Sequence, residues 1–130
     1  MYIGVVTINV NDQERAKEFY TKKLGWEVEM DESMGEKMRW LTVKPRGEKT
    51  SFVLAQGFGD WTPEKVGGMT GVVLEVDDVF KTAEELKKNG VEFRDEPKME
   101  FFGGWAVIKD SEGNEFGLHS PATVGAPSNN

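Results

Sequence analysis

The side chains best suited to acid–base chemistry in this sequence are one imidazole and two carboxylates on predicted strands. His119 is the only histidine among the 130 residues. An imidazole titrates near neutral pH and can act as an acid, a base or a hydrogen-bond donor. Glu115 and Glu75 lie on strand-like segments, and Glu115 falls on the same strand face as His119 because side chains alternate along a strand. His119 and Glu115 are therefore the candidate catalytic residues; the alternative is that both are solvated residues of a strand end or edge.

A second group of side chains is suited to holding a small molecule rather than to transforming it. Aromatic rings on the predicted strands offer apolar contact and stacking, while a hydroxyl and an amide offer neutral hydrogen bonds. The candidate ligand-binding residues are Thr7, Asn9, Trp40, Phe52, Phe102, Trp105 and His119. The alternative is that at least half of the aromatic rings fill the core between helix and sheet. Gly103 and Gly104 precede Trp105 and permit a bulge or a close backbone approach to a ligand.

The elements that must position these residues follow from hydrophobic periodicity and turn residues. Asn11 and Asp12 cap a helix that Gly25 ends, and Asp77 and Asp78 cap a second helix that Asn89 and Gly90 end. Apolar alternation predicts strands over residues 3–10, 26–30, 38–44, 50–55, 71–76, 91–93, 105–109 and 115–119. Residues 56–69 carry four glycines and a proline, a composition typical of a connection, and include Trp61, which either closes over a site or packs at a dimer interface.

The order of these elements repeats. Residues 5–12 align with residues 71–78 at a spacing of 66, and both helices end in Lys-Lys-x-Gly. After the helices the spacing falls to 65, so the second helical segment is one residue shorter. Each half therefore has the order β-α-β-β-β, which predicts an α+β fold built from a duplicated unit. Val6, Ile8 and Val10 share the face expected to pack on the helix, and Val5, Thr7 and Asn9 share the opposite face.

Composition excludes several classes of function. The formal net charge of −7 disfavours a nucleic-acid partner, since an acidic surface repels phosphate. The absence of cysteine removes thiol nucleophiles, thiolate metal sites and disulfides, and is consistent with a cytoplasmic protein. No run of about 20 apolar residues is present to span a membrane, and the first residues do not resemble a signal peptide.

The repeated unit resembles the glyoxalase/bleomycin-resistance/dioxygenase (vicinal oxygen chelate) superfamily over about residues 2–119. The segments that carry the resemblance are residues 4–12, 18–20, 24–26, 71–78 and 86–93, and the segment 110–118, DSEGNEFGL, which is similar to the family's D-P-D-G-N-x-x-E-L. The resemblance implies one domain over residues 1–119, with module one at about 1–55, a connection at 56–69 and module two at about 70–119. It implies a cup-shaped mixed sheet with helices on its outer face, and commonly a homodimer. Residues 120–130 are expected to form a flexible tail.

The family's metal-dependent members take His, Glu or Gln ligands from the first, fourth, fifth and eighth strands. Those positions fall here on Val5, Val53, Gly71 and Gly117. Valine and glycine offer no side-chain donor to a divalent ion. The resemblance therefore implies the scaffold, and we expect no metal and no other cofactor.

These observations favour a protein that binds a small, largely apolar or aromatic molecule in a metal-free cup, with a sequestration or resistance-type role. One alternative is a lyase- or isomerase-type enzyme of the same superfamily, acting through His119 or Glu115 without the usual metal or with an atypical one. Another is an interaction module whose cup is filled by its own aromatic side chains. Arg39 and Arg94 are weaker candidates for an anionic ligand, because charged strand residues usually face water.

Overall fold

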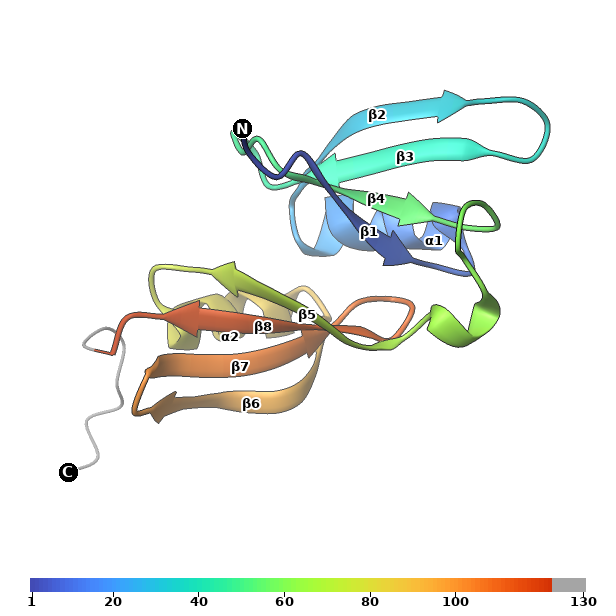
Figure 1. Ribbon diagram of the computed structural model, residues 1–130. Coiled ribbons are helices and arrows are strands. Elements are labelled where there is room, and N and C mark those ends of the chain that lie inside the picture. Colours follow the sequence, from blue (N-terminus) through green and yellow to red (C-terminus); the bar gives the residue numbers. More distant parts are fainter. Residues whose placement is uncertain (123–130) are drawn as a thin grey trace. The chain divides into compact units, whose positions relative to one another are not determined.

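The computed structural model describes residues 1–122, which form two four-stranded sheets, each with one helical segment on one face (Figure 1). The first half contains β1 (Val5–Asn9), α1 (Gln13–Glu18), η1 (Phe19–Lys23), β2 (Glu27–Ser33), β3 (Arg39–Lys44) and β4 (Ser51–Ala55). The second half contains η2 (Pro63–Lys65), β5 (Gly68–Glu75), α2 (Val79–Lys88), β6 (Glu92–Glu100), β7 (Gly103–Lys109) and β8 (Asn114–Ser120). The α+β fold with two βαβββ units that the sequence predicts is confirmed.

The two sheets have the same strand order. The first is β1-β4-β3-β2 and the second is β5-β8-β7-β6. β1 runs parallel to β4, while β2, β3 and β4 are antiparallel neighbours, so the first sheet is mixed. The equivalent order in the second sheet supports the duplication that the residue spacing predicts.

Both helices begin at the aspartates that the sequence marks as caps. The Asp12 carboxylate accepts a hydrogen bond from the amide of Arg15, and the Asp78 carboxylate accepts from the amides of Phe80 and Lys81. These bonds satisfy amides that have no partner within the helix and fix where each helix starts.

The one-residue difference between the repeats has a structural cause in the first helix. Residues Phe19–Lys23 form a π-helix, and the Leu24 amide reaches back five residues to the Phe19 carbonyl at 3.2 Å. The Trp26 amide then donates to the Tyr20 carbonyl, six residues earlier, whereas the equivalent Val91 amide in the second half donates to Leu86, five residues earlier. The first helix therefore carries an inserted residue, accommodated as a π-turn.

Each helix covers an apolar face of its own sheet. In the first half the buried side chains include Ile8, Val10, Ala16, Phe19, Tyr20, Leu41, Val43, Phe52 and Leu54. In the second half they include Val79, Ala83, Val91, Ala106, Ile108, Phe116 and Leu118. The burial of Ile8 and Val10 agrees with the face predicted from alternation, and the exposed Thr7 and the half-buried Asn9 lie on the other face.

The chain divides into two compact units that do not coincide with the two halves of the sequence. Unit 1 contains Met1–Gly68 together with Asp110–Asn114, and unit 2 contains Met69–Lys109 together with Glu115–Asn130. The turn between β7 and β8 therefore belongs to unit 1, although its flanking strands belong to unit 2.

Several boundaries differ from the sequence prediction, and three of the differences affect how the elements connect. β6 continues to Glu100, well beyond the predicted residue 93, and the predicted connection contains the short helix η2 and the start of β5. β8 ends at Ser120, which is buried, so the predicted tail begins one residue later. Residues 123–130, the rest of that tail, lie outside the described residues. None of the helices within residues 1–122 is long and apolar enough to cross a membrane.

Candidate ligand-binding site

Unit 1 contains a pocket of about 270 Å³ on the sheet face opposite the helix. Its floor is formed by Thr7 and Asn9 from β1 and by Ala55, which pairs with Asn9 in the β1–β4 register. Its wall comes from the connection after β4 and consists of Phe58, Gly59, Asp60, Trp61 and Lys65. The pocket thus combines two aromatic rings with a hydroxyl, an amide, a carboxylate and an ammonium group.

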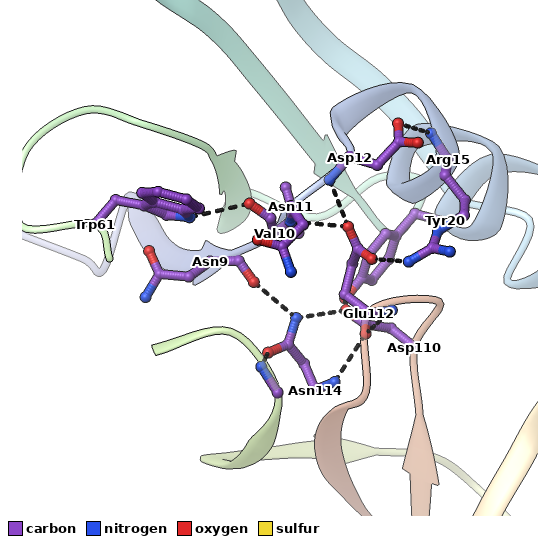
Figure 2. Close-up of polar contacts among 11 residues, drawn as sticks. Asn9, Val10, Asn11, Asp12, Arg15, Tyr20, Trp61, Asp110, Glu112 and Asn114 are labelled. Carbon is purple, nitrogen blue, oxygen red and sulfur yellow. Dashed lines mark hydrogen bonds and ion pairs between the residues drawn. The ribbon is translucent and has the colours of Figure 1, made fainter. Parts of the chain in front are cut away.

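Hydrogen bonds hold the connection against the end of β1. The indole N–H of Trp61 donates to the Val10 carbonyl at 3.0 Å (Figure 2). Within the connection, the Lys65 ammonium donates to the Asp60 carbonyl at 2.6 Å. Trp61, which the sequence places either over a site or at an interface, therefore lies over the β1 end and lines the pocket of unit 1.

Trp40 and a buried hydroxyl extend the same sheet face. Thr42 pairs with Val53 on β4, and Val53 pairs with Thr7 on β1, so the three residues lie side by side across the sheet. Trp40 lies two residues before Thr42, on the same face, and its ring centroid is 6.4 Å from that of Phe58. Thr42 is 1% exposed, and its buried hydroxyl has no hydrogen-bond partner among the described residues.

Phe52 lies on the other face of that sheet. It pairs with Val6 and Val43, and its ring packs 6.0 Å from Tyr20 and 5.2 Å from Trp26 between sheet and helix. We therefore leave Phe52 out of the proposed ligand site and assign it to the core of unit 1.

Unit 2 brings the remaining candidate residues together. Phe102 lies in the turn between β6 and β7, and Trp105 and His119 are directly opposite each other on β7 and β8. The Phe102 ring stacks on the His119 ring with centroids 6.1 Å apart, and it meets the Trp105 ring edge-on at 5.6 Å. We call these three residues the aromatic platform.

His119 is held at both ring nitrogens. Nδ1 lies 2.5 Å from a carboxylate oxygen of Glu75, and Nε2 lies 2.7 Å from the Phe102 carbonyl. The Phe102 carbonyl and then the Glu75 carboxylate raise the pKa of His119, because both acceptors favour the protonated ring. In this arrangement His119 anchors Phe102, and both of its ring nitrogens have protein partners.

Glu115, the other candidate catalytic residue, forms an ion pair within the protein. Its carboxylate pairs with the Arg94 guanidinium at 2.8 Å, and Arg94 also pairs with Asp95 at 2.9 Å. In unit 1, Arg39 pairs with Asp31 at 2.8 Å and with Glu14 at 2.9 Å. Both arginines that the sequence offered for an anionic ligand therefore lie in ion pairs within the protein.

The paired glycines before Trp105 accommodate the protein's own chain. A Cβ at Gly103 would lie 2.3 Å from the Ser120 carbonyl oxygen, and one at Gly104 would lie 2.5 Å from a methyl carbon of Val79. These glycines thus allow β7 to approach β8 and α2 closely, and the space beside them is occupied by protein.

The four positions of the family's metal ligands do not fit a metal ion. Val5, Val53 and Gly71 carry no donor atom, and a Cβ at Gly117 would lie 2.3 Å from Cη2 of Trp105, so the indole already occupies the space of an eighth-strand ligand. Over residues 1–122, no group of three or more His, Cys, Asp or Glu side chains is placed to bind a metal.

The turn Asp110–Asn114, which carries the strongest sequence resemblance, makes an extensive set of polar contacts in unit 1 (Figure 2). The Glu112 carboxylate accepts hydrogen bonds from the amides of Asn11 at 2.9 Å and Asp12 at 2.6 Å, and it also pairs with Arg15. The side-chain nitrogen of Asn114 donates to the backbone carbonyl of Asn9 at 3.0 Å. The side-chain oxygen of Asn114 accepts from the backbone amide of Gly67 at 2.8 Å. Asn114 therefore ties the β1 floor of the pocket to the end of the connection that forms its wall.

Sequence reasoning missed most of the pocket wall. Phe58, Gly59, Asp60 and Lys65 lie in a segment whose glycines mark a connection but do not indicate which way its side chains point. The local signal was two bulky rings, Phe58 and Trp61, within a stretch rich in glycine and polar residues, and sequence reasoning singled out only Trp61. Their position depends on the hydrogen bonds of Trp61 and Gly67 to residues distant in the sequence.

Known proteins share both the sequence and the fold. The model of the Glyoxalase/Bleomycin resistance protein/Dioxygenase superfamily matches residues 2–118. The Bacillus subtilis (strain 168) protein YetH is 38% identical over 114 residues, which are 88% of this chain and 93% of YetH. The crystal structure of UcmS2 is 38% identical, with a TM-score of 0.80 over 92% of this chain and 97% of that one. TnmS3, an antibiotic binding protein from Streptomyces sp. CB03234 with a known crystal structure, is 35% identical in sequence. The two structures align with a TM-score of 0.79 over 93% of this chain and 96% of the TnmS3 chain. With its duplicated βαβββ units, this chain belongs to the glyoxalase/bleomycin resistance protein/dioxygenase superfamily.

Proposed function

We propose that the protein binds a small, largely apolar or aromatic molecule without a protein-bound metal, in a sequestration or resistance-type role. The observation that carries the proposal concerns the positions where metal-dependent members of the family hold their metal ligands. In this chain those positions offer apolar surface and no metal-binding side chain. The four metal-ligand positions hold valine or glycine, and the Trp105 ring takes the space above Gly117. A site without a metal must hold its ligand mainly by apolar contact, stacking and a few hydrogen bonds.

The pocket of unit 1 supports this proposal. Thr7 and Asn9 place a hydroxyl and an amide on its floor, beside the rings of Phe58 and Trp61. Figure 2 shows the Asn9 side chain directed away from Asn114, which bonds only the Asn9 backbone carbonyl. A few directional polar groups within an apolar wall are typical of small-molecule sites, where they set the orientation of the ligand. The similarity to the antibiotic binding protein TnmS3 supports a small-molecule ligand and makes antibiotics the first compounds to test.

As part of this proposal, the protein acts as a homodimer in the cytoplasm. Large apolar side chains are exposed in both units, including Val5 at 43%, Met69 at 47%, Val73 at 47% and Phe102 at 44%. Exposed apolar groups on a sheet face are often covered by a partner or a ligand. Sedimentation equilibrium measures the assembly directly: a molecular mass near twice 14.6 kDa is expected, and a monomer at all concentrations contradicts the homodimer.

The function is tested by a thermal-shift screen of aromatic antibiotics with and without EDTA, followed by calorimetry on the compounds that stabilise the protein. We expect at least one compound to bind with an affinity that EDTA leaves unchanged. Thr7→Val and Asn9→Ala are expected to weaken binding about tenfold each, the loss of one good hydrogen bond. Thr62→Val is the matched control, because Thr62 is exposed and does not line the pocket.

Two results would contradict the proposal. Binding that disappears in EDTA and returns with a divalent ion would show that the ligand needs a metal. Equal affinities for the wild type, Thr7→Val and Asn9→Ala would show that the pocket of unit 1 does not hold the ligand.

A further inference from the structure

The ring of Trp105 and the backbone of Gly117 share one small volume in unit 2. A Cβ built at Gly117 would lie 2.3 Å from Cη2 and 2.9 Å from both Cζ2 and Cζ3 of Trp105. Non-bonded carbon atoms do not approach this closely, so any side chain at position 117 would displace the indole. Gly117 is not in a left-handed conformation, and its lack of a side chain therefore serves the packing of Trp105 and not the backbone of β8.

Strand register explains how the indole reaches that position. Trp105 is opposite His119, and Gly117 is opposite Val107, so Trp105 is the diagonal neighbour of Gly117 on one face of the sheet. Diagonal neighbours are within reach of a long aromatic side chain. The indole extends along the sheet over the bare backbone of β8 and stays partly exposed.

The Trp105 ring is continuous with the rest of the aromatic platform. Phe102 contacts it edge-on and is itself fixed by stacking on His119 and by the bond from His119 Nε2 to its carbonyl. Phe102 is 44% exposed, so the platform is open to solvent. Because the Phe102 and Trp105 rings are nearly perpendicular, at 79°, a flat aromatic molecule can stack on one ring while its edge meets the other, which a compact saturated molecule of similar size cannot do.

We infer that Gly117 determines the specificity of this site: by leaving room for the Trp105 indole, it makes the aromatic platform a surface that selects a flat aromatic ligand. The inference rests on the proposed function: it adds to the pocket of unit 1 a second binding surface, in unit 2, and names the ligand class of that surface. The formal net charge of −7 and the negative faces of the rings favour a neutral or cationic ligand over an anion.

Calorimetry with two cationic probes tests the inference. 9-Aminoacridine is a flat aromatic amine, and 1-aminoadamantane is a compact saturated amine. We expect the wild type to bind 9-aminoacridine at least about tenfold more tightly, and Gly117→Ala to lose most of that preference. Gly4→Ala is the matched control, because a Cβ at the exposed Gly4 would meet no atom within 4 Å and its backbone is unstrained. Its affinities should equal those of the wild type.

Two further variants keep the test informative if Gly117→Ala is poorly folded. Trp105→Leu removes the ring and leaves Gly117 in place, and we expect it to lose the preference for 9-aminoacridine. The double variant Gly117→Ala/Trp105→Leu relieves the overlap at Cβ, so its thermal stability should exceed that of Gly117→Ala while the preference stays lost. A Trp105→Leu protein that binds 9-aminoacridine like the wild type overturns the inference.

The remaining outcomes separate this inference from the proposed function. Equal affinity of the wild type for both probes overturns the selection of flat ligands, while binding itself stands. Failure of the wild type to bind 9-aminoacridine also overturns the inference, whereas the antibiotic screen and its EDTA arm decide the proposed function independently.

Discussion

The hydroxyl of Tyr20 donates a hydrogen bond to the carboxylate of Asp110 at 2.7 Å, across 90 residues of sequence and within the core of unit 1. Tyr20 is 1% exposed and Asp110 is 6% exposed. Asp110 also accepts bonds from the Glu112 amide and from the amide and side chain of Asn114. The Tyr20–Asp110 bond thus joins the first helix to the turn between β7 and β8.

Tyr20→Phe should lower the free energy of unfolding by about 1–3 kcal/mol, because it leaves a buried carboxylate oxygen with one donor fewer. Urea denaturation followed by circular dichroism measures the change. Tyr2→Phe is the control, since Tyr2 is 66% exposed and should lose almost nothing. Equal stability of both variants would mean that the bond contributes nothing net.

Ionisation of Tyr20 should also make the folded protein less stable at alkaline pH. Burial and the Asp110 carboxylate raise the pKa of Tyr20 well above its usual value. A group whose pKa is higher in the folded state adds stability below its unfolded pKa, about 10 for tyrosine, and loses it as pH rises toward the folded pKa. Between about pH 9 and 11 the wild type should therefore lose more stability than Tyr20→Phe. Parallel losses in the two proteins would contradict this.

Glu112 should stabilise the start of α1 through its carboxylate. Its side chain is 1% exposed and accepts from the amides of Asn11 and Asp12. Glu112→Ala should cost about 1–3 kcal/mol, because it leaves two amides at a helix N-terminus without acceptors. Glu112→Gln keeps an acceptor oxygen and should cost less.

The ion pair of Glu112 serves as an internal comparison. Arg15 is 58% exposed on its side chain, so Arg15→Ala should cost less than about 1 kcal/mol. Chemical denaturation of the three variants orders the effects. If Arg15→Ala were as costly as Glu112→Ala, the ion pair and not the helix cap would be the main contribution.

His119 should titrate above the ordinary histidine value. The Phe102 carbonyl and the Glu75 carboxylate both raise its pKa, so it should lie above about 6.5 in an NMR titration. As the sole histidine, it gives an unambiguous signal. The stability that His119 adds should be present below about pH 6.5 and fall as pH rises through its folded pKa. Glu75→Gln should lower the pKa only in part, because the Phe102 carbonyl remains; a wild-type pKa at or below 6.5 contradicts the geometry.

Asn114 should hold the wall of the pocket in place. Asn114→Asp keeps an acceptor for the Gly67 amide but places a carboxylate against the Asn9 carbonyl and the Asp110 carboxylate. We expect a loss of about 1–3 kcal/mol or more, and faster hydrogen exchange at the Gly67 amide. Unchanged exchange at Gly67 would show that the connection is held by other contacts.

The repeat, the helix starts and most strands could be predicted from the sequence, because they depend on neighbouring residues. Asp12 and Asp78 cap the amides that immediately follow them, and alternation placed Ile8 and Val10 in the core. The loss of one residue between the repeats was also visible, although its form, a π-turn at Phe19–Lys23, was not.

Tertiary structure decided which of the candidate residues meet. Phe52 and Thr7 were both candidates for the ligand face, yet pairing of Phe52 with Val6 put its ring in the core. The placement of the Trp105 ring over Gly117 follows from strand register. The docking of Glu112 and Asn114 in unit 1 joins residues about 100 positions apart. Such contacts depend on strand order, register and chain crossing, which local periodicity does not encode. The sequence alone therefore determined the repeated scaffold and the absence of metal-binding side chains at the family's ligand positions. The folded chain determined which apolar and polar surfaces stand in their place.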